Sequence, residues 1–272
     1  MKSQAEKLHE CILIIAEEIK RICIKNEIKY FLIGGSLLGS LRHNGFIPWD
    51  DDMDIGMLRK DYEKFVSVAS RELKSDYFIS SIDSEKNYGL PFVKIRLKGT
   101  HFRESIEPLE NEDGIFVDIF PIDRIPDWTV SRTIQSLELR LYKRALLYKC
   151  HYRVDDSSQN KVIVAVTKML GLLPKEYISR KLKKVQQKYN NKHSKMYANL
   201  CSSYAYGKEV FPCDTLDKEC IMADFEENEY PISPDADRIL NLLYGDYMKL
   251  PPEEKRIFRH ATKDIVFGQY EE

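Results

Sequence analysis

Four aspartates fall within the five residues 50 to 54, and this cluster constrains the fold of the chain more than any other feature. From Asp52 through Met53, Asp54 and Ile55, polar and apolar side chains alternate as in a half-buried β-strand. Carboxylates this close repel one another in a low-dielectric setting, so a packed fold tolerates them only with a cation among them. Because strand residues two apart share a face, Asp52 and Asp54 are expected to hold one divalent ion or to bracket two.

A third aspartate, Asp118, lies among four large apolar residues from Phe116 to Phe120. We expect a strand over residues 115–120 that ends at Pro121. A carboxylate in apolar surroundings is costly unless it is paired or bound to a metal, so Asp118 is the best candidate to complete the site. Hard oxygen ligands favour Mg²⁺ or Mn²⁺ over Zn²⁺. The alternative interpretation, an acidic turn that caps the next helix, does not explain the alternation with apolar residues.

The run Gly34-Gly35-Ser36 follows a short β-prone segment, residues 30–33, and precedes helical spacing of leucines. A strand that ends in glycines at a helix N-terminus can bring bare backbone N–H groups close to an anion. The run therefore predicts a phosphate-binding turn, although the same three residues are also common in ordinary turns.

The remaining periodicity predicts an α+β protein whose sheet is mixed and flanked by helices, with a mostly helical and basic second part. The first 125 residues mix the two kinds of element, and the pattern turns helical from residue 131. Helices are expected over residues 5–25, 60–73, 134–148, 162–173, 177–189 and 235–243, and a further strand over residues 91–97.

Charge is distributed unevenly along the chain, whose formal net charge is −1. Residues 131–200 contain 16 Lys or Arg against 4 Asp or Glu, a local charge of +12. One interpretation is a set of solvated helix faces. The other is a surface that meets an anionic membrane or a polyanionic acceptor, with peripheral attachment.

The cysteines and the apolar segments bear on the compartment. Six cysteines are scattered without CxxC spacing, and residues 1–6 lead into a charged amphipathic pattern rather than an apolar signal core. The most apolar stretch, residues 162–174, is too short to cross a bilayer, which takes about 20 residues. We therefore expect a reduced, cytoplasmic protein that attaches peripherally to the inner face of the membrane and does not bind nucleic acid.

Three ordered blocks of this sequence resemble the LicD phosphocholine transferases, relatives of the fukutin-type phosphotransferases. The first runs from Phe31 to Gly39 and on from Arg42 to Ile55, the second from Val117 to Pro121, and the third from Leu243 to Arg256. The resemblance implies the nucleotidyltransferase fold. It also favours a division into a catalytic core over residues 1–128, a basic helical region over 129–200, and a segment over 201–272 that completes the active site.

The resemblance further implies Mg²⁺-dependent transfer of phosphocholine, or a similar phospho-alcohol, from a CDP-activated donor. The acceptor would be a hydroxyl of a cell-surface glycan, such as a teichoic acid, lipopolysaccharide or capsule, or of its lipid-linked precursor, with CMP released. Carried over to this chain, the metal-binding and catalytic residues are Asp52, Asp54 and Asp118, and the residues of the phosphate turn are Gly34, Gly35 and Ser36. Further candidate phosphate ligands, which could equally be ordinary surface residues, are Arg42, Lys94 and Arg96.

Two other functions use the same residues. A nucleotidyltransferase that moves NMP to a small-molecule hydroxyl would share the metal-binding acids, although the long first and third blocks favour the LicD-like interpretation. A non-catalytic glycan- or nucleotide-binding protein would carry the acids as vestiges. The activated donor, the acceptor glycan and Mg²⁺ are the expected ligands of the first interpretation.

Overall fold

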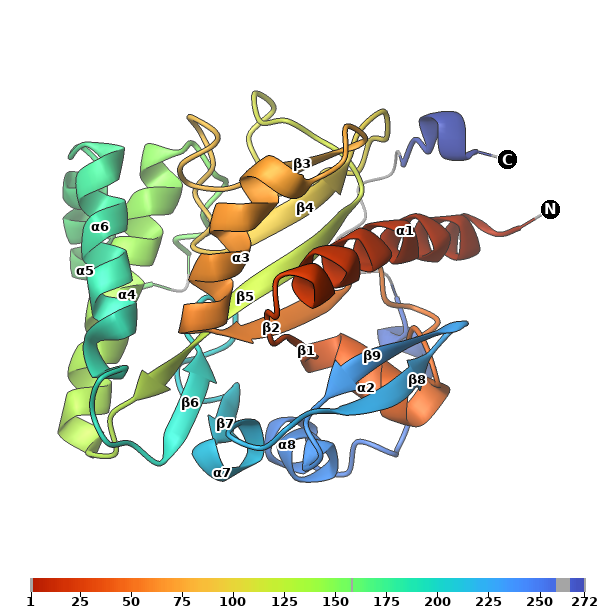
Figure 1. Ribbon diagram of the computed structural model, residues 1–272. Coiled ribbons are helices and arrows are strands. Elements are labelled where there is room, and N and C mark those ends of the chain that lie inside the picture. The colour runs from red at the N-terminus through yellow and green to blue at the C-terminus, as the bar shows by residue number, and fades with distance from the viewer. Residues whose placement is uncertain (1, 158, 258–264, 272) are drawn as a thin grey trace.

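A computed structural model describes residues 2–157, 159–257 and 265–271 of the chain. The described residues form a mixed sheet of seven strands flanked by helices (Figure 1), which confirms the expected α+β class. Along the sheet the order is β1-β2-β5-β4-β3, and β6 and β7 extend it from β5. The strands are β1 (Phe31–Leu32), β2 (Asp54–Leu58), β3 (Tyr77–Ser80), β4 (Val93–Leu97), β5 (Phe116–Ile125), β6 (Met196–Asn199) and β7 (Val210–Pro212).

Helices account for most of the remaining regular structure. A separate antiparallel pair is formed by β8 (Ile221–Phe225) and β9 (Asn228–Ile232). The α-helices are α1 (Gln4–Lys25), α2 (Gly34–His43), α3 (Arg59–Glu72), α4 (Thr129–Lys149), α5 (Lys161–Leu170), α6 (Lys175–Gln186), α7 (Cys213–Leu216) and α8 (Ala236–Tyr244). Short 3₁₀ helices are η1 (Gln187–Tyr189), η2 (Glu253–Lys255) and η3 (Gly268–Tyr270). Among the described helices, none combines the length and the apolar character that crossing a membrane requires.

The N-terminal helix α1 packs against the sheet and α3 through an apolar stripe. Ile12, Ile15, Ile19 and Ile22 recur at helical spacing and are completely buried. Ser3 begins the helix with a capping box, in which its hydroxyl accepts from the backbone N–H of Glu6 while the Glu6 carboxylate accepts from the backbone N–H of Ser3. The helix therefore starts and faces inward as its sequence predicts.

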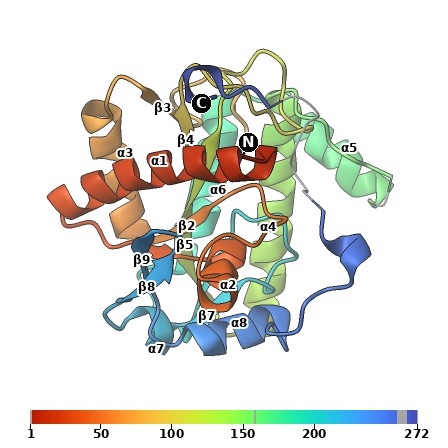
Figure 2. The same cartoon turned by 90° about the vertical axis from the view of Figure 1, so that its right-hand side faces the viewer.

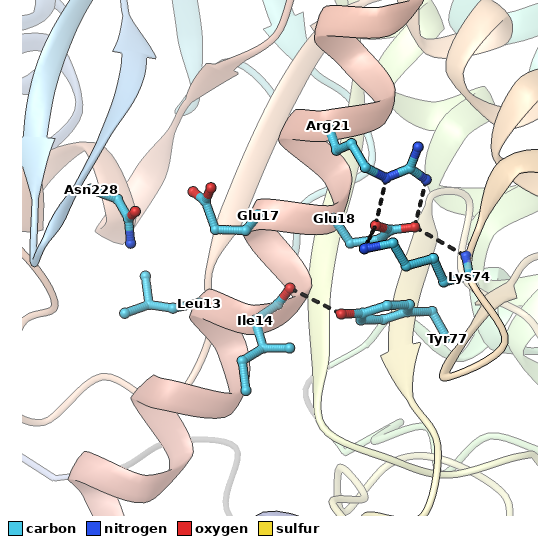
Figure 3. Close-up of a pocket in the computed structure, with 8 residues that line it drawn as sticks. All are labelled: Leu13, Ile14, Glu17, Glu18, Arg21, Lys74, Tyr77 and Asn228. Carbon is cyan, nitrogen blue, oxygen red and sulfur yellow. Dashed lines mark hydrogen bonds and ion pairs between the residues drawn. The ribbon is translucent and has the colours of Figure 1, made fainter.

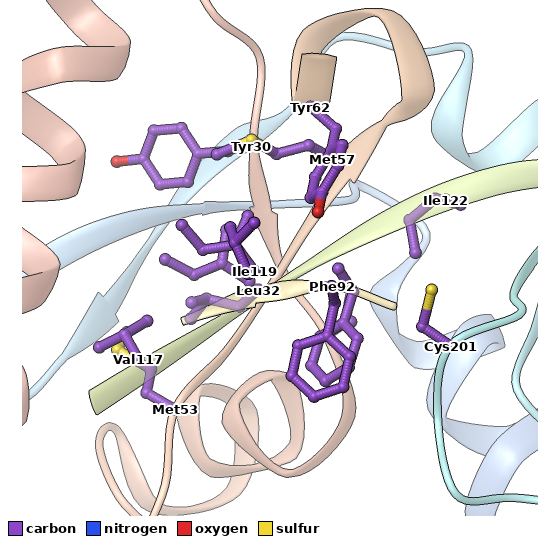
Figure 4. Close-up of a cluster of buried hydrophobic side chains, with 14 of the residues drawn as sticks. Tyr30, Leu32, Met53, Met57, Tyr62, Phe92, Val117, Ile119, Ile122 and Cys201 are labelled. Atoms are coloured by element: carbon purple, nitrogen blue, oxygen red, sulfur yellow. The ribbon is translucent and has the colours of Figure 1, made fainter. Parts of the chain in front are cut away.

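Strand β5 is the centre of the sheet and of the hydrophobic core (Figure 4). It pairs in parallel with β2 and antiparallel with β4 and β6. Val117 and Ile119 are completely buried, as are Met53 and Met57 on the neighbouring segment. Because alternate strand residues face opposite sides, Asp118 projects from the face opposite to that of Val117 and Ile119.

The expectation that this strand ends at Pro121 is wrong, because β5 continues to Ile125. The backbone N–H of Asp118 donates to the carbonyl oxygen of Met53 on the β2 side, at 3.0 Å. Successive backbone N–H groups of a strand point to opposite sides, so the nitrogen of Pro121 points away from β2. On that side β4 pairs with β5 only as far as residue 119 of β5, and the pairing with β6 begins at residue 122. Proline consequently costs this ladder no hydrogen bond.

Two further expectations about elements need correction. The strand predicted over the aspartate cluster begins at Asp54, so Asp52 lies in the segment before it. The helical second part holds for residues 129–189, but β6 to β9 follow it, and β6 and β7 join the main sheet. These later strands are short, and alternation is hard to recognise in them from sequence alone.

Candidate active site

Asp54 lies at the start of β2 and Asp118 lies beside it, near the start of β5. They are direct partners in the parallel pairing of the two strands. Paired residues of neighbouring strands project from the same face of a sheet, so both carboxyl groups share one side. The fold thus brings together two of the three predicted metal ligands.

The turn between β1 and α2 lies against these acids. Gly34 adopts a positive φ of 57°, and a Cβ atom added to it would lie 2.9 Å from Oδ2 of Asp54. A Cβ atom on Gly35 would lie 2.5 Å from Oδ2 of Asp50. The positive φ favours glycine at position 34, and at both positions an added side chain would displace a carboxylate of the acid cluster. The predicted phosphate turn and the acid cluster are one site.

Ser36 supports the site from the first turn of α2. Its buried hydroxyl oxygen accepts a hydrogen bond of 2.8 Å from the backbone N–H of Asp54. This bond fixes the start of β2 relative to the glycine turn. In this arrangement Ser36 positions the strand, in addition to any contact that it makes with phosphate.

The third predicted ligand, Asp52, belongs to a cluster with Asp50 and Asp51. One carboxylate oxygen from each of these three residues lies within 4.8 Å of the others. Asp51 is buried, whereas Asp50 and Asp52 are half-buried. The charges of Asp52 and Asp50 both act on Asp54. Four carboxylates from the 50–54 segment therefore gather around the place where β2 begins.

Electrostatics at this place favour a bound cation. Burial, together with the neighbouring charges of Asp52 and Asp118, raises the pKa of Asp54 well above its ordinary value. Burial also raises the pKa of Asp118 to about 7, although Lys94 opposes the shift. A divalent cation would stabilise the ionised carboxylates, and an all-oxygen set of donors suits Mg²⁺ or Mn²⁺. The residues present thus fit the metal that the sequence predicts.

Lys94 holds Asp118 from the adjacent strand β4. Its ammonium group lies 2.8 Å from Oδ1 of Asp118 and 3.0 Å from Oε2 of Glu104, and 3.4 Å above the ring of Phe116. Burial alone would lower the pKa of Lys94, but the two carboxylates outweigh burial and raise it to about 12. The structure thus places Lys94 in the site as the partner of a predicted ligand, rather than as an exposed phosphate contact.

Arg96 lies two residues farther along β4 and is fully buried. Its guanidinium group donates to the hydroxyl of Ser80 at 3.1 Å, to the carbonyl oxygen of Gly114 at 3.0 Å and to the carboxylate of Glu107 at 2.6 Å. These bonds engage the side chain with β3 and with the loop that follows β4. The arrangement gives no support to a phosphate-binding role for Arg96.

Arg42 connects α2 to the segment after α8. Its Nη1 donates to the carbonyl oxygen of Tyr247 at 2.6 Å, and its Nε donates to Nε2 of His43 at 3.0 Å. Nearby, the guanidinium group of Arg256 lies 5.4 Å from the ring centre of Trp49, next to the aspartate cluster. Arg256 was not among the predicted site residues, because its approach to Trp49 depends on the path of the C-terminal segment.

Sequence reasoning also missed Glu209, which precedes β7 and is buried. Burial raises its pKa to about 7, opposed by hydrogen bonds from Ser202 and Asn199 and by the charge of Lys143. The charge of Glu209 contributes to the raised pKa of Asp54, so the two acids are electrostatically linked. In the sequence Glu209 follows a glycine and a lysine and precedes a valine. A single glutamate in such a segment gives no signal that it lies near the other acids.

A separate surface pocket lies between α1 and the start of β3 (Figure 3). Glu18 pairs there with Arg21 at 2.7 Å and with Lys74 at 3.6 Å. The hydroxyl of Tyr77 donates to the carbonyl oxygen of Ile14 at 3.4 Å. Glu18, Arg21 and Lys74 thus bond to one another, and none of the clustered aspartates lines this pocket, so it is not the candidate active site.

Comparisons with known proteins match the part of the chain that contains the candidate site. Residues 27–143 match the family model described as LicD/FKTN/FKRP, nucleotidyltransferase domain. The lipopolysaccharide cholinephosphotransferase LicD of Haemophilus influenzae is 28% identical over 260 residues, which cover 93% of this chain and 95% of that protein. The ribitol 5-phosphate transferase FKRP of Homo sapiens is 53% identical over 89 residues, 32% of this chain and 18% of its own length. The matched domain contains the glycine turn, the aspartate cluster and Asp118.

Proposed function

Because the chain belongs to the LicD family through its nucleotidyltransferase domain, we propose that it transfers a phospho-alcohol, with phosphocholine as the first candidate, from a CDP-activated donor to a glycan hydroxyl. CMP is the second product of this reaction. The names of the relatives support this class, because one transfers cholinephosphate to lipopolysaccharide and another transfers ribitol 5-phosphate. The acceptor proposed here is a cell-surface glycan or its lipid-linked precursor.

The observation that carries the proposal is the pairing of Asp54 with Asp118 beside a glycine turn. The missing side chains of Gly34 and Gly35 let the carboxylates of Asp54 and Asp50 lie directly against the turn, which is where the donor diphosphate is proposed to bind. Asp52, Asp54 and Asp118 are the residues that would hold Mg²⁺. When bound, the ion would neutralise charge on the donor diphosphate and on the departing CMP.

The residues of the chain itself position the reacting groups. Lys94 bonds to Oδ1 of Asp118 and so fixes the orientation of that carboxyl group. In the proposed reaction the oxygen of the acceptor hydroxyl attacks the phosphorus that carries the alcohol. The bond between this phosphorus and the CMP oxygen breaks, and the proton of the acceptor hydroxyl passes to Asp118. Asp118 is the carboxyl group proposed to accept this proton, because it lies beside the other acids and Lys94 holds its second oxygen in place.

The direct test supplies purified protein with CDP-choline, Mg²⁺ and lipopolysaccharide that lacks phosphocholine. The proposal expects CMP and phosphocholine-bearing glycan in equal amounts, and loss of both with Asp54→Asn. Asp76→Asn is the matched control, because Asp76 is an exposed aspartate directly before β3. CDP-ribitol replaces CDP-choline in a parallel reaction to identify the alcohol.

Two results would contradict the proposal. Consumption of CTP or ATP with release of pyrophosphate would assign the site to NMP transfer. The second result has two parts: Asp54→Asn binds metal and ligand as well as the unmodified protein does, and the unmodified protein turns over no CDP-activated donor. Together they would indicate a non-catalytic binding protein.

A further inference from the structure

Helix α5 turns an apolar surface toward solvent. Of its ten residues, all of which the structure describes, Thr167 alone is buried. Exposed fractions reach 69% for Val162, 70% for Met169 and 82% for Leu172 just after the helix. With the partly exposed neighbours on the same segment, the surface, here called the α5 apolar surface, consists of Val162, Val166, Met169, Leu172 and Leu173.

This arrangement reverses the usual packing of an amphipathic helix, whose apolar stripe faces the core. Helix α5 contacts α4, and Gly171 at its end lies so close that an added Cβ would be 3.3 Å from the carbonyl oxygen of Ala145. Figure 2 shows α5 projecting from the body of the molecule. The helix is thus anchored at its C-terminal end and presents its apolar side chains outward.

The charges around α5 indicate what covers this surface. The segment around α5 carries Lys161, Lys168 and Lys175 and is flanked by Asp155, Asp156 and Glu176, and it lies within the 131–200 region, whose net charge is +12. Lys168 forms an ion pair with Asp156 at 3.3 Å, and the ammonium group of Lys175 donates to two backbone carbonyl oxygens. A second copy of the chain would bring a second basic region to the interface, which disfavours self-association. An anionic partner is complementary.

The dimensions of the helix favour a lipid surface as that partner. Ten helical residues span about 15 Å, half of the hydrocarbon thickness, so α5 can lie in the interfacial layer but cannot cross it. Apolar side chains that enter the boundary of the acyl chains, with lysines at the height of the head groups, are the pattern of interfacial helices.

We infer that α5 docks the protein on an anionic lipid bilayer, with the α5 apolar surface inserted between head groups. Lys161, at the first position of the helix, lies at the level of the lipid phosphates. The inference goes beyond the proposed reaction and does not depend on it, since it concerns a surface outside the acid cluster. If both hold, docking brings the active site to lipid-linked acceptors.

Flotation of the full-length protein with vesicles tests the inference without any turnover. One set contains phosphatidylglycerol and phosphatidylcholine in equal amounts, and the other contains phosphatidylcholine alone. We expect binding to the first set, about tenfold weaker binding for Met169→Ser/Leu172→Ser because two apolar anchors are lost, and about fivefold weaker binding for Lys161→Gln. Ile221→Ser/Met222→Ser is the matched control, because both residues are about half exposed on β8, and it should bind like the unmodified protein.

Several outcomes would overturn the inference. They are no binding to the anionic vesicles, equal binding to both sets, or equal loss in the α5 and β8 variants. Light scattering after size-exclusion chromatography is the second measurement, because a dimer that the α5 variant abolishes would assign the surface to self-association. Circular dichroism checks that each variant is folded, and CMP release from the donor, measured in the absence of lipid, keeps this test separate from that of the proposed function.

Discussion

Asp54 and Asp118 are direct partners across two parallel strands. The turn at Gly34 lies against this pair, because a Cβ atom added to Gly34 would be 2.9 Å from Oδ2 of Asp54. Parallel pairing requires a connection that crosses over the sheet, and here α3, β3 and β4 lie between the two strands in the chain. An ionised Asp54 is unfavourable for folding by itself, because burial and the charges of Asp52 and Asp118 raise its pKa. The cation proposed for this site would offset that cost.

The first prediction concerns the balance between stability and function at Asp54. Asp54→Asn removes a buried charge that its neighbours repel, so in EDTA the variant should melt at a higher temperature than the unmodified protein. Added Mg²⁺ should raise the melting temperature of the unmodified protein and leave that of the variant nearly unchanged. Transfer activity should fall about 100-fold or more. Calorimetry with and without Mg²⁺ measures both effects, and a variant less stable in EDTA would contradict the electrostatic argument.

The second prediction separates two costs of replacing Gly34: the close contact that a side chain would make and the strain of its backbone conformation. Gly34→Ala should destabilise the fold more than Gly99→Ala, although both residues have positive φ. Both variants place alanine in a left-handed conformation, which costs about 1–2 kcal/mol. Nothing lies within 4 Å of an added Cβ at Gly99, whereas the one at Gly34 meets Asp54 at 2.9 Å. Urea unfolding measures the two free energies, and equal values would show that the contact does not matter.

The local sequence patterns were sufficient to predict most elements of the first part of the fold. The apolar spacing of α1, the turn at Gly34 and the alternation around Asp54 are local signals, and each corresponds to an observed element. The end of β5 was wrongly predicted because the effect of Pro121 depends on which neighbouring strand its nitrogen faces. That information belongs to the sheet and not to the segment.

The candidate site shows the same limit. Asp54 and Asp118 were predicted from their apolar surroundings, which identify a costly buried charge. The partners of these acids could not be predicted, because Lys94 reaches Asp118 only through the pairing of β4 with β5. Glu209 comes from a loop whose position is set by β6 and β7. Long-range strand pairing therefore supplies what local pattern lacks.

The third prediction concerns the buried ion pair of Lys94. Lys94→Met leaves the carboxylates of Asp118 and Glu104 without their shared cation, and should lower the free energy of unfolding by about 3–5 kcal/mol. Adding Asp118→Asn to this variant should recover part of the loss, because one of the uncompensated charges is then removed. The matched control is Lys188→Met, whose half-exposed pair with Glu138 should contribute about 0–1 kcal/mol. Equal effects of the two single variants would mean that Lys94 does not stabilise Asp118.

The last prediction follows from the raised pKa of Glu209. An acid whose pKa is higher in the folded than in the unfolded state favours folding while it is protonated. Stability from this group is therefore lost as the pH rises from about 4.5, the ordinary value, through the folded pKa of about 7. Glu209→Gln keeps an oxygen that can accept from Ser202 and Asn199 and removes the charge, so its free energy of unfolding should exceed that of the unmodified protein at pH 8 and approach it at pH 4.

Urea unfolding at intervals from pH 4 to pH 8 measures this difference for Glu209→Gln and for the control Glu219→Gln, whose side chain is largely exposed. Only the first variant should show a difference that grows with pH, because only a buried carboxyl group has a folded pKa near 7. A difference that shrinks as the pH rises would mean that Lys143, whose ammonium group acts on Glu209, stabilises the ionised form more than burial destabilises it.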